Sequence, residues 1–259
     1  MMFGAPPVIM FCVTGREHLM MCIWSVRSLR QWEYTRIEIV VATELEKQFI
    51  HKHLGDIICE VVEAEMQGYR MWAWRPFVLE RYRIKHQDAD VVICDADVLW
   101  HRNPIPLFDR FRGQPWIHKI TSLDPGEFEE FEFLSAVPKR RIGLRTMLAY
   151  RDQYGLDCYP NFHLNCGLFM LDNDTFPVVL QEWAKVIRAV PPERMIMTEA
   201  LLSLVYAKLG IEPVSDEADI KHHGITQREV KLRVVQYRAV SVEPEGVTSY
   251  QMAKHYFSN

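Results

Sequence analysis

Residues 89–97 read Ala-Asp-Val-Val-Ile-Cys-Asp-Ala-Asp, an apolar run that ends in two carboxylates. The run predicts a buried strand, and open α/β sheets bind ligands beside the carboxyl ends of their strands. In extended backbone, side chains two positions apart point to the same side, so Asp95 and Asp97 are expected to face one hard divalent cation. The alternative is an acidic turn after a strand, because chance places Asp-X-Asp in many chains.

Short β-branched runs alternate with helical patterns along the rest of the chain. This alternation predicts an α/β fold with a Rossmann-like, mostly parallel central sheet flanked by helices. Gly55 is the expected stop of one helix, and Arg75-Pro76 the expected start of another. Strands are expected at residues 8–14, 36–43, 57–62, 89–97 and 162–172, and helices at 44–54, from 75 onward, and after a turn at 15–17, where Leu19, Ile23, Val26 and Leu29 mark the apolar face.

The length and composition suit one folded unit. The 259 residues are 49% hydrophobic, which is enough for one large core, so we expect a single domain over residues 1–259. The formal net charge is −4 and the basic cluster at 139–141 is short, which argues against a nucleic-acid surface. Residues 124–161 are the least regular segment, and we expect either a lid or binding loop there or a simple insertion.

Cysteine usage and the apolar runs bear on the compartment. The six cysteines form no Cys-X-X-Cys motif, and four of them lie in apolar runs where a thiol behaves as a small hydrophobe (Cys12, Cys59, Cys94 and Cys166). A reducing, cytoplasmic setting is therefore expected. The apolar run at 8–13 lacks a cationic leader and no stretch approaches about 18 apolar residues, so we expect no transmembrane segment and at most peripheral membrane contact.

An asparagine and a glycine precede the last long apolar run. Asn165 offers a hydrogen-bond donor and an acceptor together, as recognition of sugar hydroxyls requires, and Gly167 allows close approach of the backbone to a ligand. A bulge at the entry to a strand accounts for the same residues and is the favoured interpretation when this segment is taken alone.

Taken in order, these segments resemble the glycosyltransferases of the GT-A fold, especially the family 8 type that retains anomeric configuration. The resemblance covers nearly the whole chain and is specific as an ordered series. Its pieces are the opening strand and helix, Val40-Val41-Ala42-Thr43, the Asp-X-Asp motif within 91–99, Asn103-Pro104 with Leu107-Phe108, Asn165-Cys166-Gly167 and Lys254-His255-Tyr256-Phe257. It implies a nucleotide-binding half at residues 1–110 and a half for donor and acceptor sugars at 111–259.

The resemblance also implies a set of site residues. Asp95, Asp97 and His255 would hold Mn²⁺, or Mg²⁺, on the diphosphate of a nucleotide sugar, for which a uridine diphosphate sugar is expected. Carboxylate and imidazole ligands together suit manganese better than calcium. The implied contacts to the donor, including nucleobase and ribose contacts at the end of the first strand, come from Val13, Thr14, Arg75, Ala96, Asn165 and Gly167.

The sequence departs from the family 8 pattern in two places. The Lys-Pro-Trp that usually follows the histidine is absent because the sequence ends at Asn259, so we expect either a longer natural protein or a missing clamp on the diphosphate. Where the family carries Asp-Gln at a helix start, this chain has Thr198-Glu199. Glu199 resembles the glutamate of retaining family 6 enzymes, as a nucleophile or as support for an oxocarbenium-like transition state. An exposed or helix-capping glutamate is the alternative.

The expected function is transfer of a sugar from a nucleotide sugar to a glycan, glycolipid or protein acceptor. A nucleotidyltransferase is the first alternative, but residues 14–17 do not form the Gly-rich loop it needs. A non-catalytic sugar- or partner-binding module on the same fold is the second. His222 and His223 suggest a separate metal pair, although neighbours on a strand diverge, so a polar loop is the preferred interpretation of that segment.

Overall fold

The computed structural model describes residues 5–62, 75–85, 90–100, 102–117, 120–122, 151–153, 162–164, 166–172, 174–189, 198–215, 220–223 and 232–235. Two predicted site residues, Asn165 and His255, lie outside these ranges. So do the basic cluster at 139–141 and all of the predicted loop at 124–161 except residues 151–153, which are helical.

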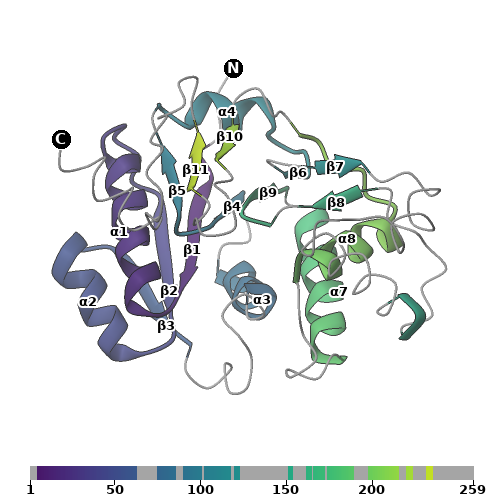
Figure 1. Ribbon diagram of the computed structural model, residues 1–259, viewed down its shortest axis with the longest axis horizontal. Coiled ribbons are helices and arrows are strands. Elements are labelled where there is room, and N and C mark those ends of the chain that lie inside the picture. Colours follow the sequence, from purple (N-terminus) through teal and green to yellow (C-terminus); the bar gives the residue numbers. More distant parts are fainter. Residues whose placement is uncertain are drawn as a thin grey trace.

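A six-stranded sheet forms the centre of the molecule (Figure 1). Four neighbouring strands pair in parallel, and β9 runs antiparallel to both of its neighbours. The strand order is β3 (Ile58–Val61), β2 (Ile37–Val41), β1 (Val8–Val13), β4 (Val91–Cys94), β9 (Leu168–Leu171) and β6 (Trp116–Ile117). The predicted α/β class with a mostly parallel central sheet is confirmed.

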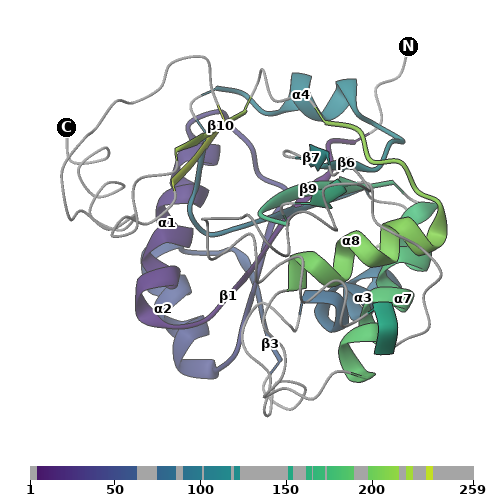
Figure 2. The same cartoon turned by 45° about the vertical axis from the view of Figure 1, so that its right-hand side comes forward.

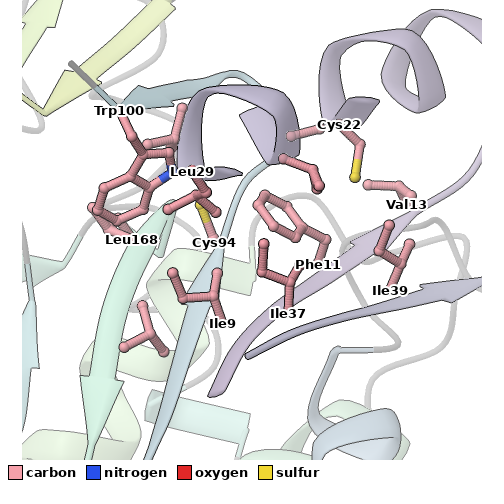
Figure 3. Packing of buried hydrophobic residues seen from close by; sticks show 14 of the residues in the cluster. Ile9, Phe11, Val13, Cys22, Leu29, Ile37, Ile39, Cys94, Trp100 and Leu168 are labelled. Atoms are coloured by element: carbon pink, nitrogen blue, oxygen red, sulfur yellow. The ribbon is translucent and has the colours of Figure 1, made fainter. Parts of the chain in front are cut away.

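Different helices cover the two faces of this sheet, as Figures 1 and 2 show. Alternate residues of β1 explain how both faces are buried. Ile9, Phe11 and Val13 join one apolar core with α1 and α2, part of which Figure 3 shows in detail, while Met10 and Cys12 join the opposite core with α3, α7 and α8. The helices are α1 (Arg16–Arg30), α2 (Glu44–Leu54), α3 (Arg75–Lys85), α7 (Thr175–Ala189) and α8 (Thr198–Leu209).

The starts and stops of the first two helices follow from local chemistry. α2 opens with a capping box, in which the Thr43 hydroxyl accepts the Glu46 N–H and the Glu46 carboxylate accepts the Thr43 N–H. It ends at Gly55, whose φ of 71° closes the helix as predicted. All four residues of the predicted apolar face of α1 are buried (Leu19, Ile23, Val26 and Leu29).

Gly15→Ala is expected to destabilise the fold by about 1–3 kcal/mol, because Gly15 has φ 83° and ψ 142°, a backbone region that few other residues adopt. Space is not the reason, since an added Cβ would come no closer than 4.0 Å to His18 Nδ1. Urea unfolding of the wild type and the variant measures the cost. An unchanged free energy of unfolding would contradict this explanation of the glycine.

A three-stranded sheet lies beside the first one, in the order β10 (Ile220–His223), β11 (Leu232–Val235) and β5 (Val98–Trp100). The polar loop expected around His222 and His223 is wrong, because both residues lie in β10 and pair with β11. The end of α1 holds β5 in place: the Ser28 hydroxyl accepts the Trp100 N–H at 3.0 Å, and the Trp32 indole donates to the Trp100 carbonyl at 2.9 Å.

The single strand predicted at 162–172 is also wrong. Residues Phe162–Leu164 form β8, which pairs with β7 (Ile120–Ser122) in a separate two-stranded sheet. A turn at Cys166–Gly167 then leads into β9 of the six-stranded sheet. The short helix α4 (Ile105–Arg110) begins directly after Asn103-Pro104. No helix in the described part of the chain has both the length and the apolar composition needed to cross a bilayer.

Packing accounts for the cysteines that the structure describes. Cys12, Cys22, Cys59, Cys94 and Cys166 are buried thiols rather than halves of disulfides. Burial raises the pKa of the Cys12 thiol to about 11 and that of the Cys59 thiol to about 12. These two thiols therefore remain protonated at neutral pH and act as small apolar groups, as predicted for them.

Candidate functional site

The connections between the strands determine where this sheet can bind a ligand. β1 pairs in parallel with β2 on one side and with β4 on the other. The chain passes from β1 to β2 through α1, and from β3 to β4 through α3. Because these connections lead to opposite sides of β1, the carboxyl ends of β1 and β4 form a topological switch point, where open α/β sheets bind ligands. Thr14 and Asp95 are the residues directly after these two strands.

The Asp-X-Asp motif forms a tight turn. β4 ends at Cys94, and the Val98 N–H donates to the Asp95 carbonyl at 3.3 Å, which closes a four-residue turn around Ala96 and Asp97. The extended backbone expected for the two aspartates is therefore wrong. The turn is needed because the chain leaves the six-stranded sheet after β4 and enters the three-stranded sheet as β5.

A second bond fixes this turn to the neighbouring strand. The Asp95 N–H donates to the Gly167 carbonyl at 2.7 Å, next to the β4–β9 pair Cys94 and Leu168. Gly167 and Ala96 are both buried. The structure thus brings together three of the predicted donor-site residues, Asp95, Ala96 and Gly167.

Arg75, the first residue of α3, joins the same group. Its guanidinium forms an ion pair with Asp95 Oδ1 and donates to the Cys166 carbonyl at 3.0 Å. The Arg75 and Asp95 side chains are 13% and 21% exposed, so the pair is largely shielded from water. The Arg75 charge also partly offsets the rise that burial causes in the pKa of Cys12. Arg75 therefore joins the end of β4 to the turn before β9.

The acidic residues of the turn fit a hard divalent cation that also binds phosphate oxygens. Asp95 and Asp97 leave the same turn, and one carboxylate oxygen of Asp97, Oδ1, is buried. Oxygen ligands suit magnesium and manganese, and proteins often hold such a cation through one or two carboxylates together with the phosphates of a substrate. Within the described ranges, no three or more His, Cys, Asp or Glu side chains gather as a metal site. Asp95 and Asp97 are the described residues of this turn that could hold such a cation.

Glu46 contacts the loop after β1, and the sequence did not predict it as part of the candidate site. It lies near the start of α2, and its carboxylate accepts hydrogen bonds from the Thr14 hydroxyl at 2.6 Å and the Gly15 N–H at 2.7 Å. The Thr43 and Glu46 spacing of a capping box was a visible signal for its role at the helix start. The sequence carried no signal for its contact with Thr14, which is 32 residues away.

Val13 and Glu199 are placed differently. Val13 is buried as the last residue of β1, so its backbone rather than its side chain can face a ligand. Glu199 is half-buried in the first turn of α8, and its carbonyl accepts the Ser203 hydroxyl at 2.9 Å. The Ser203 hydroxyl in turn accepts the Leu164 N–H at 3.1 Å. This bond ties α8 to β8 at Leu164, which lies two residues before Cys166. The Glu199 carboxylate forms no hydrogen bond or ion pair with another described residue.

Comparison with known proteins gives structural neighbours only. No model of a protein family matches the sequence, and a search of curated proteins found no match. The galactosyltransferase LgtC, solved in complex with donor and acceptor sugar analogues, is 15% identical with a TM-score of 0.44, over 79% of this chain and 72% of LgtC. An active-site mutant of LgtC is 16% identical with a TM-score of 0.42, over 76% and 69%.

The bifunctional glycosyltransferase WbbM, solved without ligand, is 14% identical with a TM-score of 0.46. The alignment covers 79% of this chain but only 38% of WbbM. All three neighbours are structures of glycosyltransferases. Similarity at 14–16% identity with TM-scores below 0.5 does not assign this chain to a family.

Proposed function

We propose that this protein is a metal-dependent glycosyltransferase. In this proposal it moves a sugar from a nucleoside diphosphate sugar, with uridine as the expected nucleoside, to a glycan, lipid or protein acceptor with retention of configuration. The observation that carries the proposal is the Asp95–Asp97 turn at the carboxyl end of β4, with the Arg75 guanidinium fixed beside it. Acidic groups for a cation and a basic group for phosphate thus meet at one edge of the sheet.

The chemistry follows from the charge of the leaving group. Breaking the bond between sugar and phosphate leaves a nucleoside diphosphate, whose terminal phosphate gains negative charge in the transition state. Manganese or magnesium, held by Asp95 and Asp97 with His255 as the third proposed ligand, would supply positive charge at that phosphate. Arg75 adds a planar set of N–H donors that suits phosphate oxygens. Its bond to the Cys166 carbonyl orients the guanidinium at the edge of the site.

The remaining residues have proposed binding roles. Thr14 and the backbone of Val13 meet the nucleoside at the end of β1, while Ala96 and Gly167 lie beside the diphosphate and the donor sugar. Asn165, directly before the Cys166–Gly167 turn in the sequence, is proposed to bind sugar hydroxyls, since its amide both donates and accepts.

Release of nucleoside diphosphate from a panel of nucleotide sugars tests this proposal. With manganese present, the protein is expected to release uridine diphosphate from at least one uridine diphosphate sugar, faster when a suitable acceptor is added. A chelator should stop the release, and added manganese should restore it. Release of pyrophosphate from a nucleoside triphosphate and a sugar phosphate would instead identify a nucleotidyltransferase and contradict the proposal.

Arg75→Met is expected to lower kcat/KM about 10²–10³-fold, because it removes a donor that acts on charge developing in the transition state. Arg75→Lys should recover part of the loss, since an ammonium keeps the charge but cannot bond Asp95 and the Cys166 carbonyl with one rigid fork. Steady-state kinetics with the donor sugar measure both variants. Arg112→Met is the matched control, because Arg112 bonds Asp109 at 2.7 Å on α4 and the Ala5 carbonyl at 3.2 Å. Equal kinetics for Arg75→Met and Arg112→Met would contradict the role of Arg75.

A further inference from the structure

The carboxylate of Glu46 joins the two loops that follow the neighbouring strands β1 and β2. One oxygen, Oε1, accepts from Thr14 Oγ1 at 2.6 Å and from the Gly15 N–H at 2.7 Å. The other oxygen, Oε2, accepts from the Ala42 N–H at 2.9 Å and from the Thr43 N–H at 3.2 Å. Each oxygen therefore serves one loop, and the side chain fixes the spacing between the carboxyl ends of the two strands.

These contacts exceed what the start of α2 requires. A capping box needs only the reciprocal bonds between Thr43 and Glu46. The bonds to Thr14 and Gly15 contribute nothing to that cap, and they act on the loop between β1 and α1 instead. Both backbone polar groups of Gly15 form hydrogen bonds. Its N–H donates to Glu46, and its carbonyl accepts the Leu19 N–H at 3.0 Å in the first turn of α1.

We infer that Glu46 is a positioning residue for the nucleoside end of the donor site. This inference rests on the proposed function, because it requires the loop after β1 to meet a nucleotide. Thr14 has one hydroxyl proton and donates it to Glu46, so its oxygen meets a bound nucleoside as an acceptor. The matching ligand group is a donor, either a ribose hydroxyl or a ring N–H of the base. Glu46 acts through Thr14 and Gly15, since each of its oxygens already accepts two hydrogen bonds.

Glu46→Gln tests the role with little change in volume. An amide presents one acceptor oxygen and an NH₂ group, so it can accept from one loop but sets its own donors against the N–H groups of the other. Affinity for uridine diphosphate with manganese, measured by calorimetry, is expected to fall at least about tenfold, with a matching rise in the KM of the donor sugar. The kcat is expected to change little, because the loop binds substrate and transition state alike.

Glu44→Gln is the matched control. Glu44 is an exposed acidic residue in the same first turn of α2, so its loss has a similar effect on the helix dipole without touching the loop after β1. It should leave the affinity, the KM and the kcat unchanged. Thr14→Val removes the hydroxyl that bonds Glu46 and that is proposed to meet the nucleoside, so it tests this contact if Glu46→Gln does not fold. It is expected to weaken nucleotide binding several-fold at full thermal stability.

The outcomes separate the inference from the proposed function. If the wild type binds no uridine diphosphate with manganese, the proposed function is wrong and the positioning role falls with it. If the wild type binds but Glu46→Gln and Thr14→Val bind equally well, the positioning role is wrong and the proposed function stands. A fall in melting temperature without any rise in KM would show that Glu46 serves the fold alone, which also overturns the inference.

Discussion

Asp97→Asn and Asp95→Asn are expected to remove metal-dependent activity while the fold survives. Each change keeps the side-chain volume and deletes one ligand charge, and loss of even an outer partner of a metal ligand costs about 10–100-fold in metal affinity. The turn should persist in both variants, because backbone groups close it between Val98 and Asp95 and tie it to Gly167. Turnover of the donor sugar is expected to fall at least about a hundredfold at a fixed manganese concentration.

The two variants should differ in one respect. Asp95→Asn also removes the charge that pairs with Arg75, whereas Asp97→Asn leaves that ion pair in place. Asp56→Asn is the matched control, since Asp56 is exposed just before β3, at the opposite edge of the parallel strands. Circular dichroism checks that all three variants fold. Wild-type turnover in both Asp95→Asn and Asp97→Asn would contradict the assignment of the motif to the metal.

Glu199→Gln is expected to lower turnover by several orders of magnitude if Glu199 is the nucleophile, with donor affinity nearly unchanged. An interaction made mainly in the transition state affects kcat and kcat/KM equally. The loss should be smaller if Glu199 only supports an oxocarbenium-like state, because the neutral amide still presents a dipole. Rapid-mixing kinetics with the donor sugar distinguish the two sizes of effect. Glu212→Gln is the control, an exposed glutamate just beyond the other end of α8.

The stereochemistry of the product tests the same role independently. Retention of configuration is expected, and proton NMR of the anomeric coupling in the product measures it directly. The half-buried position of Glu199 at the start of α8, a helix tied through Ser203 to Leu164, is compatible with a carboxylate beside the donor sugar. An inverted product would contradict both the retaining mechanism and the role proposed for Glu199.

The sequence predicted those parts of the fold that local patterns determine. The helix stop at Gly55 and the apolar face of α1 are confirmed, because a positive φ and helical spacing act over a few residues. The extended aspartates and the single strand at 162–172 were wrong for a shared reason. In both places the chain passes from one sheet to another, and an apolar run reads the same whether it fills one sheet or two.

The arrangement of the candidate site could be predicted from the sequence only where local patterns determine it. Asp95 was visible as a carboxylate after a strand, which is a local pattern. Its ion pair with Arg75 joins residues 20 positions apart, and the bond from Thr14 to Glu46 spans 32 positions. Contacts at such separations depend on how α3 and α2 pack against the sheet. The sequence of each helix alone does not predict which residues of the sheet it contacts. The loop expected at His222 and His223 failed likewise, because pairing with β11 decides that segment.

Calorimetric titration of uridine diphosphate into the wild type and Asp97→Asn, each with and without manganese, tests whether this turn holds a metal. The wild type is expected to bind uridine diphosphate far more tightly with manganese than without it, because the cation would join the carboxylates of the turn to the diphosphate. Asp97→Asn is expected to lose this dependence while remaining folded. Equal wild-type affinity in the presence and absence of manganese, or an unchanged manganese effect in Asp97→Asn, would contradict the proposal that this turn holds the metal of a glycosyltransferase.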